Sequence, residues 1–301
     1  MARVVASTLP SAGSGVLTRN ILREKALRSL GMLPPFSPVL NRVLASLASE
    51  DVSFTKLADL IEKDTVVSAN LLQLVNSALY ARRGTVNSVR HALSLLGINK
   101  LRNAVLGMSI ARMWNQVRPP AHWSMANFNM HSVACGQLAD LLAQRVPVSY
   151  PEGAFVAGLL HDVGRLLIAI ALPDESARIA NRAAQEGCST AEAESEILGF
   201  THAELSADAL VAWNLPLPIQ EAARDHHLAP PQAVKGEWPL AVLINTADRY
   251  VNSAGITIAV TQGPPKPDPS VLGAVGLAED FRAAVIAEFE TEHAAMIPFY
   301  R

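Results

Sequence analysis

Histidine and aspartate side chains that could bind a metal gather in the second half of this sequence. They are His131, His161, Asp162, His202, His226, His227 and Asp248. Neutral imidazole and carboxylate together suit Zn, Fe or Mn, and the helices of a bundle can bring such side chains to one point. The spacings match no local zinc motif, and buried histidines also occur as hydrogen-bonded core residues. The residues alone therefore leave a metal site and a set of core histidines as alternatives.

The pair His161-Asp162 interrupts the longest apolar run of the chain, Ala154 to Leu172. This run has the length of a membrane span, but the charges at its centre favour a buried helix of a soluble protein. Burying an unpaired carboxylate costs several kcal/mol, so we expect Asp162 to be paired or bound to a metal. Arg165 follows one turn later, and it could serve either as a phosphate contact or as the counter-charge of a carboxylate.

The other polar residues have simpler interpretations. We expect His122 and His293 to lie on the surface or in loops, and Asn76 to be a buried hydrogen-bonding residue that fixes the turn after its helix. The only two cysteines are Cys135 and Cys188, which fits a reducing compartment. Both are interpreted as small core residues.

Apolar residues recur at helical spacing almost throughout, and alternating β-branched segments typical of strands are nearly absent. The sequence therefore predicts an all-α, multi-helical fold. The expected helices cover residues 39–49, 54–63, 65–80, 88–96, 99–114, 124–145, a buried helix from 152, and then 174–186, 190–198, 202–213, 218–227, 239–252 and 279–292. Gly97 is expected to end a helix, and Ser189 with Glu192 to form a capping box.

Prolines and glycines divide the chain into parts. Residues 1–29 are expected to form an N-terminal tail and lead-in, of which residues 1–20 are loose. Pro119-Pro120 is the clearest break, and it separates a helical part over residues 30–118 from a second over residues 119–255. A proline-rich loop and a last helix make up residues 256–301.

The composition excludes several classes of protein. With 50% apolar and 17% charged residues, the 301-residue chain is far from the composition of disordered proteins. A formal net charge of −2 lacks the basic excess needed for non-specific binding to DNA. Pro10, Gly13 and Gly15 interrupt the start of the chain before a signal-peptide core could form, so we expect a cytoplasmic protein.

Several linked motifs, occurring in one order, resemble the HDOD family, helical signalling relatives of the HD metal-dependent phosphohydrolases. In the first half these motifs are Leu33-Pro34-Pro35, Ile61-Glu62-Lys63-Asp64, Leu71-Leu72, Asn76-Ser77-Ala78, Val89-Arg90-His91-Ala92 and Leu95-Leu96-Gly97. In the second half they are Ala154-Phe155, the run Gly158 to Arg165, Gly199-Phe200-Thr201-His202-Ala203 and Trp213-Asn214-Leu215-Pro216. The match covers about residues 30–252.

The resemblance implies an HD-type helical core, residues 119–255, preceded by the N-terminal helical part of an HDOD domain. By analogy with HD phosphohydrolases, His131, His161, Asp162 and Asp248 match the H…HD…D set that binds one divalent metal. The remaining three, His202, His226 and His227, resemble the additional histidines that hold a second metal in HD-GYP phosphodiesterases. One or two ions of Fe, Mn, Zn or Mg are therefore expected.

Two departures from the active relatives bear on catalysis. Arg165 stands where active members usually have Lys, and Leu228-Ala229-Pro230-Pro231 follows His227 in place of the GYP element. Arg and Lys differ in the geometry with which they hold phosphate. We therefore expect little hydrolysis of cyclic dinucleotides.

The resemblance leaves two main functions open. The first is a cytoplasmic output module of bacterial signalling, which binds a protein partner without turnover, with a nucleotide or phosphate as a further ligand. This module would bind neither DNA nor a membrane. The second is a metal-dependent phosphohydrolase, with Asp162 and Arg165 as catalytic residues and Arg165 steadying the phosphate. A metal that contributes only folding energy is a third hypothesis.

Overall fold

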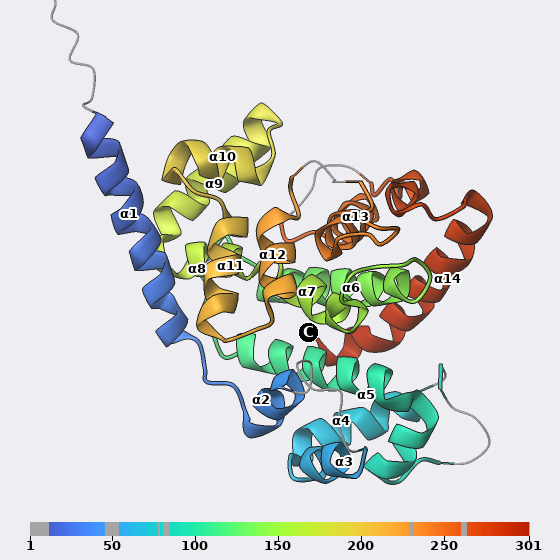
Figure 1. Ribbon diagram of the computed structural model, residues 1–301. Coiled ribbons are helices and arrows are strands. Elements are labelled where there is room, and N and C mark those ends of the chain that lie inside the picture. The colour runs from blue at the N-terminus through green and yellow to red at the C-terminus, as the bar shows by residue number, and fades with distance from the viewer. Residues whose placement is uncertain are drawn as a thin grey trace, which may run out of the picture.

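The computed structural model describes residues 12–45, 54–77, 79–80, 85–228, 232–259 and 264–300, and most of them lie in helices (Figure 1). Within these ranges there is no strand, and the isolated bridges are Val148 with Trp238 and Val234 with Glu237. The predicted all-α fold is confirmed.

The first half packs short helices around one long helix. These helices are α2 (Pro38–Ala45), α3 (Phe54–Glu62), α4 (Thr65–Val75) and α5 (Val89–Trp114). Gly97 has a φ of 75° and interrupts α5. The helix end predicted there is therefore present as a kink between two helical segments. In Figure 1, α2, α3 and α4 lie along one side of α5, and α6 and α7 contact α5 as well. Residues 46–49 of an expected helix lie outside the described residues.

Asn76 stabilises the turn after α4 through side-chain hydrogen bonds. Its Nδ2 donates to the carbonyls of Leu72 and Val86, and its Oδ1 accepts from the Val86 amide. The predicted hydrogen-bonding role is confirmed, although the side chain is exposed rather than buried. These bonds end α4 at Val75, five residues before the predicted end at Tyr80.

The second half builds a bundle around α6 and α7. Its elements are α6 (Met125–Ala143), η3 (Pro151–Gly153), α7 (Ala154–Leu160), α8 (Val163–Ala171), α9 (Pro173–Glu186), α10 (Thr190–Leu198), α11 (His202–Ala212), α12 (Leu217–Asp225), α13 (Leu240–Ser253), η4 (Pro269–Val275), α14 (Glu279–Met296) and η5 (Ile297–Phe299). The predicted capping box of Ser189 and Glu192 is confirmed at the start of α10. Buried side chains of both halves form one hydrophobic cluster.

The buried helix predicted from residue 152 is broken at the His161-Asp162 pair. Asp162 has φ −102° and ψ 11°, outside the helical range, and α8 starts at the next residue. On a continuous helix, adjacent side chains point about 100° apart. The break therefore lets two neighbouring residues face the same interior point.

The apolar run around this break is a core element. Pro151–Ala171 has the length and composition of a membrane span, but 89% of its most apolar window is buried inside the fold. The interpretation as a buried segment agrees with this finding.

The N-terminal segment differs from its prediction. Residues 12–20 were expected to be loose, but they belong to α1 (Ala12–Arg28), a helix that follows one edge of the molecule and contacts α8, α10 and α11 (Figure 1). Arg19 pairs with Glu204 at 3.4 Å and Arg23 with Asp208 at 2.6 Å, while Ala26 is buried in the core. Long-range pairing of this kind leaves little trace in the local sequence.

The C-terminal helix α14 returns to the middle of the fold, where it contacts α6 and η4. His293, expected on the surface or in a loop, is instead 6% exposed, and its Nδ1 lies 2.8 Å from Gln137 Oε1 of α6. The expectation for His122 holds, since this residue is exposed.

Candidate metal centre

The structure brings all seven residues of the predicted set to one interior point of the second half. They come from separate elements: His131 from α6, His161 and Asp162 from the α7–α8 break, His202 from the first turn of α11, His226 and His227 from the end of α12, and Asp248 from α13. All are buried except His227, which is exposed.

Two carboxylates connect the histidines. Asp248 Oδ1 lies 3.1 Å from His131 Nε2 and 3.6 Å from His161 Nε2. Asp162 reaches both sides of the cluster: its Oδ2 lies 3.7 Å from His131 Nε2, and its Oδ1 lies 3.1 Å from His202 Nε2. A carboxylate in this position can contribute one oxygen to each of two neighbouring ions.

In four of the histidines, the ring nitrogen that faces away from the centre of the cluster, Nδ1, makes a hydrogen bond that orients the ring. His131 Nδ1 lies 2.8 Å from the carbonyl oxygen of Ile256. His161 Nδ1 lies 2.7 Å from that of Gly158, and His226 Nδ1 lies 2.7 Å from that of Ala223. Because a carbonyl only accepts, each of these Nδ1 atoms carries a hydrogen and the Nε2 atom of the neutral ring has a free lone pair. Metal-binding histidines are oriented in the same way in other proteins.

The fourth of these histidines has a carboxylate partner that sequence reasoning missed. Glu194 Oε2 lies 2.6 Å from His202 Nδ1 and accepts from the His202 backbone amide at 2.7 Å. Glu194 is 2% exposed, and a buried glutamate normally requires a partner. A signal did exist, because Glu194 lies four residues before buried Leu198, on the apolar face of α10.

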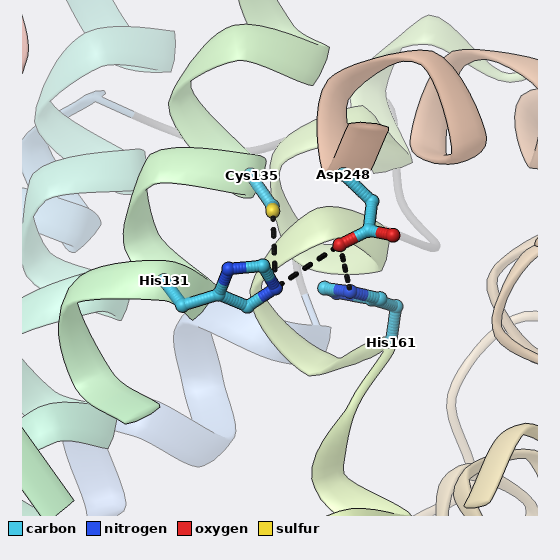
Figure 2. Close-up of side chains that lie close together, drawn as sticks. All are labelled: His131, Cys135, His161 and Asp248. Carbon is cyan, nitrogen blue, oxygen red and sulfur yellow. Dashed lines mark hydrogen bonds and ion pairs between the residues drawn. The ribbon is translucent and has the colours of Figure 1, made fainter. Parts of the chain in front are cut away.

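Cys135 also belongs to the cluster. The prediction that it is a buried residue of the core is confirmed, but its Sγ lies 3.6 Å from His131 Nε2. Figure 2 shows Cys135, His131, His161 and Asp248 turned toward a common point. The spacing of four residues on a helix was the available signal, since such residues share a face.

The cluster fits divalent metal. Its ligand atoms form two groups, and the atoms of each group lie within 4.8 Å of one another. The first group is His131, Cys135, His161 and Asp248, and the second is Asp162, His202, His226 and His227. His161 Nε2 and His226 Nε2 are buried and have no hydrogen-bond partner within the protein. A bound cation would satisfy both lone pairs.

The two carboxylates of the cluster favour a cation. Burial alone would raise the pKa values of Asp162 and Asp248, but the neighbouring histidines, and Arg165 beside Asp162, hold both well below their usual range. Burial alone would lower the pKa of His202, but Glu194 and Asp162 outweigh it and raise this pKa to about 9. Two ionised carboxylates thus face the centre of the cluster.

Arg165 is the counter-charge of Asp162. Its Nη1 donates to Asp162 Oδ2 at 3.1 Å, and its Nη2 lies 3.5 Å from Thr190 Oγ1. Of the two roles left open for this residue, the structure shows the pairing with a carboxylate. A phosphate contact and a catalytic role stay predictions.

Glycines allow the close packing that positions the ligands. A Cβ on Gly158 of α7 would lie 2.7 Å from the Cys135 carbonyl oxygen on α6. A Cβ on Gly164 of α8 would lie 2.1 Å from the His202 carbonyl oxygen. Only glycine permits these backbone contacts, which set the spacing of α6, α7, α8 and α11.

The all-α fold, with a His-Asp pair at a helix break and further histidines around it, agrees with what the HDOD resemblance implied. The HDOD domain family model matches residues 33–229, and this chain belongs to that family. The resemblance seen in the sequence is confirmed.

Solved structures of low sequence identity share the fold. An HDOD domain protein of unknown function from Geobacter sulfurreducens is 23% identical, with a TM-score of 0.74 and coverage of 94% of this chain and 99% of that one. A candidate phosphohydrolase from Shewanella amazonensis is 21% identical, with a TM-score of 0.70 over 92% of this chain and 98% of that one. A candidate signal-transduction protein from Marinobacter aquaeolei is 19% identical, with a TM-score of 0.70 over 94% of this chain and 66% of that one.

A curated relative is an uncharacterized protein from Treponema pallidum. It is 23% identical over 233 residues, which are 73% of this chain and 43% of the relative. The chain thus matches under half the length of this relative.

Proposed function

We propose that this HDOD protein is a regulatory output module of bacterial signalling that retains a divalent-metal site. The supporting observation is the convergence of seven predicted ligands, with the Nε2 atoms of His131, His161 and His226 facing inward and their Nδ1 atoms held by carbonyls. A fold alone does not assign function, so the proposal rests on this cluster.

Two ions are proposed. The first would be held by His131, His161 and Asp248, the second by His202, His226 and His227, with Asp162 between them. Imidazole and carboxylate ligands suit Fe, Mn or Zn, and carboxylates also suit Mg.

Protein purified without chelators should therefore contain two divalent ions per chain by elemental analysis. His226→Ala should remove one ion, because His226 belongs only to the second group. His122→Ala is the matched control, since this histidine is exposed, pairs with Ser176 and belongs to neither group of ligands. One ion per chain, unchanged in His226→Ala, would contradict the second site, and protein without metal would contradict the proposal.

Phosphoester hydrolysis is the alternative function. The exposed position of His227 supports it, because a substrate could reach the second metal site from solvent there. Bound metals of this class supply a water whose pKa is lowered toward about 7. Arg165 is however occupied by Asp162, and no GYP element follows His227. Since correct orientation can account for roughly 7–11 kcal/mol of a barrier, we expect slow turnover.

Turnover of cyclic dinucleotides and simple phosphoesters, with Mn, Fe or Mg added, separates these functions. The native chain should show little activity. Robust turnover that Asp162→Ala abolishes would make this protein an enzyme, and turnover that survives the substitution would indicate a contaminant.

The partner proposed for the regulatory role is a cytoplasmic signalling protein, with a nucleotide or phosphate as a further ligand. The charge of −2 supports a partner other than DNA.

A further inference from the structure

The first group of ligand atoms contains a thiol that the H…HD…D pattern does not include. Cys135 lies one helical turn after His131 on α6 and is fully buried. His131 is fixed by the bond between its Nδ1 and the Ile256 carbonyl, so its Nε2 faces the Cys135 Sγ atom (Figure 2).

The distances in this group match those of a tetrahedral metal site. Zn–S bonds of about 2.3 Å and Zn–N bonds of about 2.0–2.1 Å at tetrahedral angles place sulfur and nitrogen about 3.6 Å apart, and nitrogen and oxygen about 3.4 Å apart. Cys135 Sγ lies 3.6 Å from His131 Nε2. Asp248 Oδ1 lies 3.1 Å from His131 Nε2 and 3.6 Å from His161 Nε2.

A second observation points to a ligand at the same place. His161 Nε2 is buried, faces Asp248 and has no hydrogen-bond partner within the protein. A cation bound at the point where these four side chains meet would satisfy this lone pair.

We propose that Cys135 is the fourth ligand of the first ion, so that His131, His161, Asp248 and a Cys135 thiolate surround it tetrahedrally and Asp162 binds only the second ion. The inference rests on the proposed metal centre. When the ion binds, the S–H bond breaks, the proton leaves to solvent, and sulfur donates its electron pair to the metal. Thiolate ligands favour Zn, Co or Fe over the hard cations Mg and Mn.

The two sites would then differ in character. The first is buried, contains sulfur and has four protein ligands, as structural metal sites do. The second, formed by Asp162, His202, His226 and His227, contains no sulfur and is exposed at His227. We therefore expect the first ion to be retained and the second to exchange.

Cobalt substitution tests this assignment. Metal-depleted full-length protein is titrated with Co²⁺ and followed by absorption in the near ultraviolet, where thiolate-to-cobalt charge transfer appears. Native protein should show the band, and Cys135→Ser should lose it and bind the tighter ion at least roughly tenfold more weakly, since even outer partners of ligands are worth 10–100-fold. Cys188→Ser is the matched control and should keep the band, because Cys188 is the only other cysteine.

X-ray absorption of the native protein loaded with one Zn²⁺ gives an independent measurement that needs no variant. A sulfur scatterer at about 2.3 Å supports the proposal. Metal that binds with only nitrogen and oxygen neighbours overturns the assignment of Cys135 and leaves the metal centre intact. Failure of both Co²⁺ and Zn²⁺ to bind overturns the metal centre together with this assignment.

Discussion

At the scale of residues, the ligand set depends on the groups that hydrogen-bond the Nδ1 atoms of its histidines. A backbone carbonyl holds each of His131, His161 and His226, and substitution cannot remove a carbonyl. His202 alone depends on a side chain, Glu194. Glu194 is therefore the position at which a substitution can test how the orientation of a histidine affects metal binding.

We predict that Glu194→Gln weakens the second metal site by roughly 10–100-fold with little change in the first. The amide keeps an oxygen acceptor for the His202 backbone but loses the charge that favours binding through His202 Nε2. Calorimetric titration with Zn²⁺ measures both sites. Glu192→Gln is the control, because Glu192 of the same helix is exposed and only caps it. Equal affinities in native protein and Glu194→Gln would contradict an orienting role.

At the scale of elements, the centre depends on how closely α6 and α7 approach. The two helices meet with the Gly158 backbone against Cys135 and Gly136. This contact fixes the distance between His131 on α6 and His161 at the end of α7.

We predict that Gly158→Ala destabilises the protein by at least about 1–3 kcal/mol, the usual cost of overpacking, and weakens the first metal site. The added Cβ would meet the Cys135 carbonyl oxygen at 2.7 Å and the Gly136 Cα at 2.8 Å, and backbone atoms cannot move aside as a flexible side chain can. Denaturant unfolding and metal titration measure the two effects. Gly31→Ala should be near neutral, since nothing lies within 4 Å of its Cβ. A stable Gly158→Ala variant with native metal affinity would contradict this account.

The docking of α14 depends on an uncharged histidine. Burial lowers the pKa of His293 to about 4 from its ordinary value of 6.5. Between these values the unfolded chain binds a proton that the folded protein does not, so stability falls as the pH drops from 6.5 toward 4 and is fully present above 6.5. The loss is on the order of 3 kcal/mol at most, at about 1.4 kcal/mol per unit.

We predict that His293→Gln, which keeps a polar partner for Gln137, makes stability less dependent on pH over this window. Urea unfolding at several pH values measures the difference between the two proteins. His122→Gln should retain the native dependence, because His122 is exposed. A native slope in His293→Gln would show that His293 does not titrate as described.

At the scale of the whole molecule, the proposed metal centre would link helices of the second half. Its ligands come from α6, the α7–α8 break, α11, α12 and α13, whereas α3 and α4 contribute none. Metal binding therefore stabilises elements that are distant in sequence.

We predict that Zn²⁺ at 100 times its dissociation constant stabilises the protein by about 2.7 kcal/mol, and that a chelator reverses the effect. Hydrogen exchange should slow in α6, α11 and α13 and stay unchanged in α3 and α4. His161→Ala should abolish the gain in protection. A uniform change over both halves, or none in α13, would contradict the assignment of the ligands.

The sequence by itself determined much of this protein. Helical periodicity is a local property, so the all-α class and most helices of the second half were predictable, as α10 shows with identical bounds from 190 to 198. The seven clustered residues were named through the family resemblance, because their chemistry and order are visible along the chain. Spacing alone left their convergence open.

Tertiary structure decided the rest, because it depends on contacts between residues far apart in sequence. The pairing of α1 with α11 joins residues 185 positions apart, and the burial of His293 against Gln137 joins residues 156 positions apart. The break at His161-Asp162 and the place of Cys135 beside His131 likewise follow from packing around a shared interior point. A linear pattern reports which residues can bind or pack, whereas only the folded backbone fixes which of them meet.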